Sequence, residues 1–280
     1  MNDYPGIEMN LAQLTRNSVK EKLSAKGTVL SMTVTFGRGS EIARVAKAAG
    51  FDSLYVDLEH STIDLRDAGQ ICLAAQELGL TPFIRVADWR GADIGRALDA
   101  GAMGIIAPHV ETAEDAREIV RQARYFPLGE RSASPQLPLL GYRQFPVDDV
   151  FRAVNDATMV TVMLESERAL DNLEAIADVD GVDMVFVGTY DLSMDMGIPG
   201  DVCHPRVRSA LRHVVETCRR AGKFVGIGGM AGQPDELSIW IAAGAQFISC
   251  GTDLGFLIKG STLAAQRIGE ISSKVEQRHE

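Results

Sequence analysis

Residues 81–110 read TPFIRVADWRGADIGRALDAGAMGIIAPHV, and this stretch contains the building block of the fold. A short apolar run at 81–86 is followed by an amphipathic stretch that ends at Ala100-Gly101, and a second apolar run follows at 104–110. Glycine directly after a helix commonly takes the left-handed conformation that ends the helix. The pattern therefore predicts a strand, a helix and a second strand, which is the repeating unit of parallel sheets.

The same alternation recurs from residue 28 onward and predicts eight β/α units. The predicted strands are TVLSMTVTF (28–36), SLYVDLEH (53–60), TPFIRV (81–86), GIIAPHV (104–110), VTVMLE (160–165), DMVFVGT (183–189), KFVGIGG (223–229) and FISCGTD (247–253). A doubly wound open sheet gives a similar alternation, but it seldom runs through eight regular units without a second domain. We therefore predict an α/β fold of the (β/α)₈ TIM-barrel class.

Length and composition fit one such barrel, because 280 residues with 46% hydrophobic side chains can bury a single large core. We expect one domain over residues 1–280, with an extra N-terminal helix within 1–27 over one end of the barrel and an extended C-terminal helix. Segment 126–148, FPLGERSASPQLPLLGYRQFPVD, is too long for an ordinary connection. We expect this long loop near the active-site rim or at a subunit interface, with a disordered insertion as the alternative.

The charge and the cysteines limit the partners and the compartment. A formal net charge of −10 argues against binding to nucleic acid or to an anionic membrane, because both need clustered Lys and Arg. The N-terminus is polar where a signal peptide is apolar, and no apolar run approaches the length of about 18 residues that spans a membrane. The four cysteines form no CxxC pair and are typical of small core residues, so we expect a cytoplasmic protein.

Polar residues gather at the ends of the predicted strands, where a barrel carries its active site. They are Asp57, Glu59, His60, Arg85, His109, Glu165, Asp191 and Asp253. Taken singly, each is more typical of a solvated loop residue, a helix cap or a structural ion pair. Their joint placement at one rim predicts a catalytic site.

Glu165 and Asp191 are the best candidates for metal ligands. Carboxylate oxygens on neighbouring strand ends suit Mg²⁺ or Mn²⁺, and two protein ligands leave room for a substrate. A 2-oxo acid could complete the shell, and the metal would then stabilise the enolate formed when the adjacent carbon–carbon bond breaks. The alternative is that Asp191 and Glu165 only cap the helices that follow their strands.

Arg85 and His60 are candidates for the reaction itself. The Arg85 guanidinium could pair with a carboxylate or an enolate oxygen, although a buried salt bridge to Asp57 or Glu59 is the alternative. His60 could act as general base because imidazole exchanges protons near neutral pH. No Lys stands at a predicted strand end, so a Schiff-base mechanism lacks its nucleophile and the metal route is favoured.

The chain resembles the HpcH/HpaI family of class II, metal-dependent pyruvate aldolases, which act on 2,4-dihydroxyhept-2-ene-1,7-dioate and on 2-keto-3-deoxy sugar acids. The similarity runs from about residue 25 to the end and is carried by FDSLYVDLEHS (51–61), VMLES (162–166), GVDMVFVGTYDLSMDMG (181–197) and GTDLGFL (251–257). Asp-x-Glu-His, a later Glu and Gly-x-x-Asp-Leu-Ser together are a specific combination.

The resemblance implies roles for these residues. It implies that Glu165 and Asp191 bind the divalent metal, Mg²⁺ or Mn²⁺ with Co²⁺ as a further option. It also implies that Arg85 stabilises the enolate and that His60, supported by Asp99, manages the proton.

The resemblance also implies a binding mode and an assembly. The backbone near Tyr190 and Asp191 would receive the substrate carboxylate. Apart from the resemblance, Asp57 and Glu59 are candidates for residues that support the site from behind. Family members assemble as hexamers, as trimers of dimers, often with an exchanged terminal helix. A homo-oligomer of this kind is therefore expected.

Two departures from the family pattern lie in the substrate-binding set of Arg85, Met163, Tyr190 and Asp191. Met163 stands where well-known members carry a glutamine that reaches the 2-oxo acid, and this removes a hydrogen-bond donor. Tyr190 adds bulk and a hydroxyl where the family usually has a Pro and a small residue before the Asp. The specificity for pyruvate itself is therefore open.

We predict a carbon–carbon lyase that catalyses reversible aldol cleavage and addition of a pyruvate-like 2-oxo acid and an aldehyde. A metal-dependent 2-oxo acid decarboxylase, or a related enzyme that forms carbon–carbon bonds, would use the same enolate and is the nearest alternative. A barrel that only binds small molecules is a further alternative, motivated by Met163 and Tyr190. An interaction protein that uses 126–148 as an arm is the third.

Overall fold

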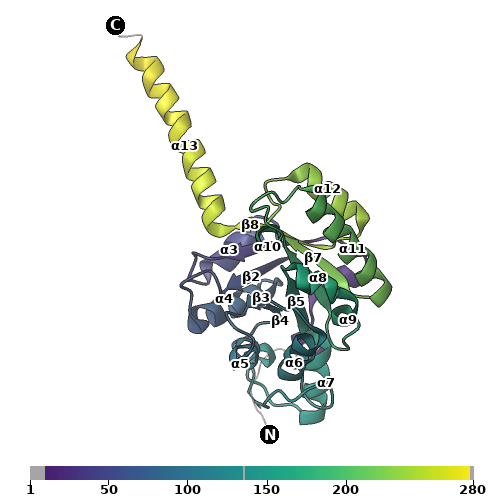
Figure 1. The fold of residues 1–280 in the computed structure, drawn as a ribbon. Helices are drawn as coiled ribbons and strands as arrows, with labels where there is room; N and C mark the ends of the chain where they lie inside the picture. The colour runs from purple at the N-terminus through teal and green to yellow at the C-terminus, as the bar shows by residue number, and fades with distance from the viewer. Residues whose placement is uncertain (1–9, 135, 278–280) are drawn as a thin grey trace.

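Eight parallel strands form a closed barrel in sequence order in the computed structural model, which describes residues 10–134 and 136–277 (Figure 1). The strands are β1 (Val29–Val34), β2 (Ser53–Asp57), β3 (Thr81–Arg85), β4 (Gly104–Ala107), β5 (Met159–Leu164), β6 (Met184–Gly188), β7 (Phe224–Gly228) and β8 (Phe247–Thr252). Pairing of β1 with β8 closes the ring. The predicted (β/α)₈ barrel is confirmed.

Helices follow the strands and cover the barrel. They are α3 (Glu41–Ala48), α4 (Leu65–Glu77), α5 (Asp93–Asp99), α6 (Ala113–Ala123), α7 (Val147–Ala157), α8 (Glu167–Asp171), α9 (Leu173–Ala177), α10 (Thr189–Asp195), α11 (Pro205–Ala221) and α12 (Pro234–Ala243), with a short 3₁₀ helix η1 (Pro138–Leu140). At the start of α6, the Thr112 side chain satisfies a free backbone N–H group, and Asp64 does the same for α4.

The strands separate two hydrophobic cores because successive side chains point to opposite faces. On β2, Leu54 and Val56 point outward into the layer between barrel and helices. Tyr55 points inward, into a second cluster that includes Phe83 and Phe186. The aromatic rings inside meet edge to face, as Tyr55 and Phe186 do with centroids 6.3 Å apart.

Glycines on β7 make room for one of these rings. A Cβ on Gly226 would lie 2.4 Å from the Phe186 ring, and a Cβ on Gly228 would lie 2.8 Å from it. Phe186 therefore fills the space that side chains from β7 would otherwise occupy, and it forms part of the cavity wall above.

The amino-terminal end of the barrel is closed by α2 (Ser18–Ser24), which follows α1 (Leu11–Leu14). Val19 and Leu23 of α2 are buried in the inner core. The Val19 N–H also donates to Thr81 Oγ1 over 3.2 Å, which ties α2 to the start of β3. The predicted helix over one end of the barrel is confirmed for these residues, and residues 1–9 lie outside the described part.

Segment 126–148 does not lie at the active-site rim, and that part of the prediction is wrong. The segment follows α6 rather than β4 and leads through η1 into α7, which precedes β5, so it lies on the amino-terminal side of the barrel. Consistent with this, Leu139 borders a cavity together with Leu80 and Thr81 at the start of β3. Its second predicted place, a subunit interface, stays a prediction.

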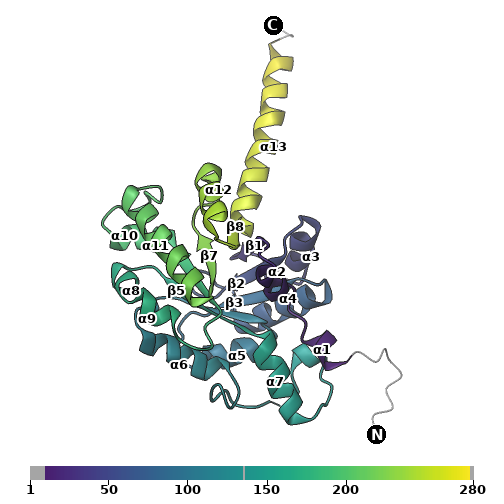
Figure 2. The same ribbon diagram turned by 90° about the vertical axis from the view of Figure 1, so that its right-hand side faces the viewer.

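The C-terminal helix α13 (Asp253–Glu276) leaves the barrel instead of folding back against it (Figures 1 and 2). It starts at the carboxyl end of β8, where the Phe256 ring lies 6.0 Å from that of Phe51. Beyond this contact its apolar side chains are exposed, among them Ile258, Ile268 and Ile271. Across residues 10–134 and 136–277, no helix is long and apolar enough to cross a membrane.

Candidate active site

The carboxyl ends of the strands enclose a cavity of about 470 Å³. Seven residues that the sequence predicts for the site line it, namely Asp57, His60, Arg85, Met163, Glu165, Tyr190 and Asp191. A larger hollow of about 900 Å³ lies between α1, α2 and α7 at the opposite end, and none of the predicted strand-end residues lines it. We therefore place the candidate site at the carboxyl ends.

Arg85 and Asp57 form a buried ion pair on neighbouring strands. The Arg85 Nε donates to Asp57 Oδ1 over 2.9 Å, and Nη2 donates to Oδ2. Glu59 Oε2 lies 3.1 Å from Arg85 Nη1, but the two atoms lack hydrogen-bond geometry. Burial alone would lower the pKa of Arg85, whereas Asp57 raises it above its usual value, so the guanidinium stays charged. The salt bridge considered as an alternative exists, and Arg85 still lines the cavity.

Asp57 also shapes the loop that carries His60. Asp57 Oδ1 accepts the N–H of Glu59 over 3.0 Å and that of His60 over 3.2 Å, which is an Asx-type turn. The His60 ring is 61% exposed at the cavity, with Nε2 3.8 Å from Glu59 Oε2. The ring is thus held near Arg85 and open to a substrate.

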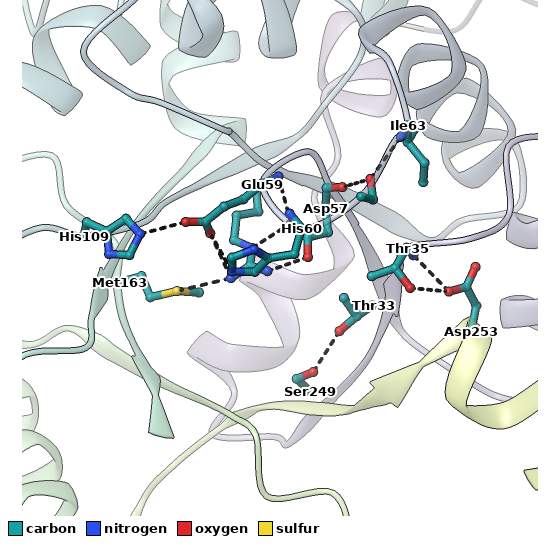
Figure 3. A network of polar contacts seen from close by, with 12 residues as sticks. Thr33, Thr35, Asp57, Glu59, His60, Ile63, His109, Met163, Ser249 and Asp253 are labelled. Carbon is teal, nitrogen blue, oxygen red and sulfur yellow. Dashed lines mark hydrogen bonds and ion pairs between the residues drawn. The ribbon is translucent and has the colours of Figure 1, made fainter. Parts of the chain in front are cut away.

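His109 contacts both Glu59 and Glu165, a role that the sequence analysis missed, and its contact with Glu59 is seen in Figure 3. Its backbone takes a left-handed φ of 54°, and its N–H donates to Glu165 Oε1 over 2.8 Å. Its Nδ1 lies 3.0 Å from the same oxygen, and its Nε2 lies 2.8 Å from Glu59 Oε1. Both ring contacts can be hydrogen bonds only when both nitrogens carry protons. The only signal in the sequence was its place at a strand end.

Glu165 is strongly perturbed by its surroundings. Burial raises the pKa of its carboxyl to about 7, with further increases from the negative charges of Asp191 and Glu59, while His109 opposes the rise. A buried carboxyl beside a second carboxylate is a group that a cation would stabilise in its charged form. Glu165 and Asp191 are therefore brought together as predicted.

The backbone leaves room for this carboxylate. A Cβ on Gly188 would lie 2.7 Å from Glu165 Oε2, so glycine at this position is needed for the observed placement. Helix capping does not explain either acid, because Ser166 caps α8 and α10 begins without a side-chain cap. The capping alternative is thus wrong in the described part of the chain.

The donor set fits a hard divalent cation that keeps open positions. Two carboxylates of Glu165 and Asp191 face one cavity, which suits Mg²⁺ or Mn²⁺ with water or substrate oxygens in the other positions. Over the described ranges, no group of three or more His, Cys, Asp or Glu side chains is arranged to hold a metal.

Met163 and Tyr190 border the same cavity. The Met163 sulfur is buried and lies 3.8 Å from Arg85 Nη1. Tyr190 is 56% exposed, and its ring packs over Gly229, where a Cβ would lie 2.8 Å from it. Both departures from the family pattern are thus in positions that a substrate can touch.

Asp99 is not brought to His60 within one chain. It is the last residue of α5, just before the amino end of β4, whereas His60 follows the carboxyl end of β2. The Asp99 carboxylate instead forms an ion pair with Arg131 over 2.7 Å. The two predicted partners therefore lie at opposite ends of the barrel.

A cluster of hydroxyls below the ion pairs was also missed. Thr33 Oγ1 and Ser249 Oγ lie 3.0 Å apart, within hydrogen-bond distance, and both residues line the cavity together with Tyr55. Burial raises the pKa of Tyr55, and the positive charge of Arg85 opposes the rise. The signal was present in the alternation of the strands, because Tyr55 precedes Asp57 by two positions and shares its inward face.

Asp253 organises the loop after β1. Its carboxylate accepts backbone N–H groups from Thr35 over 2.9 Å, from Phe36 over 3.2 Å and from Gly37 over 2.7 Å. Asp253 is also the first residue of α13. One carboxylate thus connects this helix to a loop that borders the cavity through Thr35.

Comparison with known proteins agrees with this site. Residues 32–260 match the family model HpcH/HpaI aldolase/citrate lyase. A 4-hydroxy-4-methyl-2-oxoglutarate aldolase of Chaetomium globosum is 38% identical over 259 residues, covering 91% of this chain and 96% of the relative. A 2-keto-3-deoxy-L-rhamnonate aldolase of Escherichia coli K12 is 35% identical over 245 residues, covering 86% and 88%. The crystal structure of an HpcH/HpaI aldolase from Desulfitobacterium hafniense superposes with a TM-score of 0.84 at 30% identity, covering 90% and 96%.

The closed barrel, the cavity at the carboxyl ends of its strands and the similarity to named aldolases together identify a carbon–carbon lyase of the aldolase type. The chain belongs to the HpcH/HpaI aldolase/citrate lyase family. The predicted enzyme class and family are confirmed.

Proposed function

We propose that the enzyme cleaves and forms the bond between a pyruvate-like 2-oxo acid and a carbonyl compound, with a divalent cation held by Glu165 and Asp191. The observation that carries this proposal is the convergence of these two carboxylates in one cavity, where Glu165 has its pKa raised to about 7. When bound there, Mg²⁺ or Mn²⁺, with Co²⁺ as a further option, supplies a Lewis acid that polarises the 2-oxo acid.

The remaining side chains would bind the substrate and handle charge and protons. Arg85 places its Nη1 toward the cavity beside Met163, where it can donate to the oxygen that gains negative charge during cleavage. Asp57 fixes the guanidinium through two bonds, so little reorganisation is needed. His60, exposed at the cavity, would take the proton of the hydroxyl in cleavage and return it in addition.

The predicted support of His60 by Asp99 requires a second copy of the chain, because the two residues lie at opposite ends of one barrel. We retain that pairing as a proposal for the assembled enzyme. An Asp99→Asn variant should then lower kcat in the oligomer, and the same loss should follow from dissociating the subunits.

The relatives suggest the substrate class. Cleavage of 4-hydroxy-4-methyl-2-oxoglutarate, the substrate in the name of the Chaetomium globosum relative, releases two molecules of pyruvate. We propose that this chain accepts a compound of the same kind, in which the 2-oxo acid half faces the metal ligands. Tyr190 and Met163 would contact it, since both line the cavity.

Metal removal tests the proposal directly. After EDTA treatment, retro-aldol release of pyruvate should stop, and added Mn²⁺ should restore it. Glu165→Gln should not be restored, because it removes a charged ligand while keeping the shape of the side chain. Full activity of the metal-free enzyme, or covalent trapping of pyruvate by borohydride, would contradict the mechanism.

A substrate panel separates the alternatives. Oxaloacetate consumption without aldol activity would favour the decarboxylase. Exchange of the C3 protons of pyruvate, followed by NMR, should depend on metal and would exclude a barrel that only binds ligands.

We also propose a homo-oligomer in the reducing cytoplasm, assembled through α13. A helix that projects from the barrel with exposed Ile258, Ile268 and Ile271 is stabilised when these side chains are buried against another copy. By resemblance the assembly is a hexamer built from dimers. The four cysteines, none of them in a disulfide within the described part of the chain, suit a reducing compartment.

A further inference from the structure

The inner wall of the cavity has two chemically different sides. Met163 on β5 and Phe186 on β6 are paired neighbours and form an apolar side directly below the acids of these strands. Thr33, Tyr55 and Ser249, on β1, β2 and β8, line the same cavity and carry hydroxyls. We call these three residues the hydroxyl wall; two of them, Thr33 and Ser249, are seen in Figure 3.

The topology places the hydroxyl wall across from the metal ligands. In a closed barrel of eight strands in sequence order, β1 lies opposite β5 and β2 lies opposite β6. Thr33 and Tyr55 therefore face the strands at whose carboxyl ends Glu165 and Asp191 follow. A substrate held by these acids at one end directs its other end toward the hydroxyl wall.

The hydroxyl wall is suited to an oxygen-rich, anionic group. Thr33 Oγ1 and Ser249 Oγ are 3.0 Å apart, and both residues line the cavity beside Tyr55, so three side chains with rotatable O–H donors converge within an otherwise apolar layer. Arg85 lies close enough for its positive charge to act on Tyr55. Buried hydroxyls are costly in an apolar core unless they bind a partner, and they serve a ligand without adding charge of their own.

We propose that Thr33, Tyr55 and Ser249 form a subsite for a carboxylate group on the carbonyl acceptor. The subsite lies opposite the metal ligands and selects acceptors that carry this group over uncharged aldehydes. The inference rests on the proposed aldolase function and adds the residues that set its acceptor specificity.

The test compares two acceptors that differ only at this group. Glyoxylate carries a carboxylate where acetaldehyde carries a methyl group. With the Mn²⁺-loaded enzyme and pyruvate as donor, KM is measured for both acceptors in wild type, Tyr55→Phe, Thr33→Val and Ser249→Ala. We expect the ratio of the glyoxylate KM to the acetaldehyde KM to rise about tenfold in each variant, since a hydrogen bond to a charged group is lost.

Two other buried hydroxyls of the barrel interior provide matched controls. Ser31 and Thr161 do not line the cavity, and their hydroxyls have no hydrogen-bond partner within the described residues. Ser31→Ala and Thr161→Val should therefore leave the KM ratio unchanged. Exchange of the C3 protons of pyruvate, which needs no acceptor, shows in each variant whether the metal side of the cavity is intact.

The outcomes are distinguishable. An unchanged KM ratio with intact C3 exchange overturns the subsite and leaves the aldolase proposal standing. Equal losses with both acceptors, or an equal rise of the ratio in the control variants, also overturn it, because the hydroxyls would then act on the fold. Absence of C3 exchange and of aldol addition in the wild type overturns the proposed function, and the subsite with it.

Discussion

At the scale of single residues, the site depends on how the protein keeps a buried carboxylate close to a second one. Glu165 is 5% exposed, and His109 contacts it through both its backbone N–H and its ring. A bound cation would give this carboxylate a positively charged partner. The charge state of Glu165 therefore links proton and metal binding.

Metal affinity should increase with pH around neutrality. Burial raises the pKa of Glu165 from its usual 4.5 to about 7 in the metal-free fold, so the folded protein holds a proton there that the unfolded chain has released. The metal-free fold should accordingly lose stability as the pH rises from about 4.5 to about 7, because the unfolded state binds fewer protons in that range.

Calorimetric Mn²⁺ titrations should show about one proton released at about pH 6 and few at about pH 8. The same release in Glu165→Gln would contradict this assignment.

Gly188→Ala should weaken the metal site without unfolding the barrel. The new Cβ would lie 2.7 Å from Glu165 Oε2 and must displace that carboxylate. We expect about tenfold weaker Mn²⁺ binding, a typical effect of disturbing how a ligand is held. Gly95→Ala is the control, since nothing lies within 4 Å of its Cβ position in α5. Unchanged affinity in Gly188→Ala would show that the carboxylate has room to move.

The site residues that lie at or shortly after the ends of strands could be predicted from the sequence. Glu165 and Arg85 follow apolar runs directly, and His60 and Asp191 come three residues after the ends of β2 and β6, so their convergence could be inferred from the barrel alone. The contacts of His109 could not be inferred, because they depend on its left-handed backbone, which no pattern around a histidine indicates.

At the scale of elements, α2 acts as the floor of the barrel interior. Val19 and Leu23 insert into the same cluster as Phe83 and Phe247. They close the amino-terminal end while the chemistry takes place at the other end. Stability and activity are therefore carried by different ends of the same barrel, as is usual for this fold.

Leu23→Ala should destabilise the fold and spare the active site. Leu23 is 1% exposed in the inner core, and removing such a side chain typically costs about 2–5 kcal/mol of the free energy of unfolding. Urea unfolding measures this loss, and KM for the substrate should not change. Leu128→Ala is the control, because Leu128 is 58% exposed and should cost less than about 0.5 kcal/mol. Equal stability of both variants would mean that α2 does not fill the interior.

The elements themselves were largely predictable, and the exceptions have a physical cause. Seven of the eight strands lie within their predicted ranges, and β5 begins one residue earlier than predicted, at Met159. The agreement follows because inward and outward positions are both apolar in a parallel barrel. The end at which segment 126–148 lies was predicted wrongly, since its helix, α6, was not counted before the segment. A connection after a helix returns to the amino-terminal end, whatever its composition.

At the scale of the whole molecule, α13 is the feature that a single chain does not explain. Ile268, Ile271 and Val275 recur at spacings of three and four residues, which places them on one face of the helix, and all three are exposed. Exposed apolar stripes of this kind mark interfaces.

Charges on this stripe should dissociate the assembly. Ile268→Glu with Ile271→Glu should reduce the mass measured by light scattering to that of one chain, 30.3 kDa. Gln266→Glu with Ser272→Glu adds the same charge beside the stripe and should leave the mass of the wild type. A wild-type mass in the first variant would show that α13 is not the contact between subunits.

The carboxylate of Asp253 gives this assembly a thermodynamic consequence. It belongs to the first turn of α13, and it holds the backbone of Thr35, Phe36 and Gly37 beside the cavity. If a neighbouring subunit fixes α13, it also restricts this loop, and by reciprocity a ligand that orders the loop must tighten the association of subunits by the same factor. Substrate should therefore lower the protein concentration at which the subunits dissociate. On dilution, the enzyme should lose affinity for substrate before the barrel unfolds.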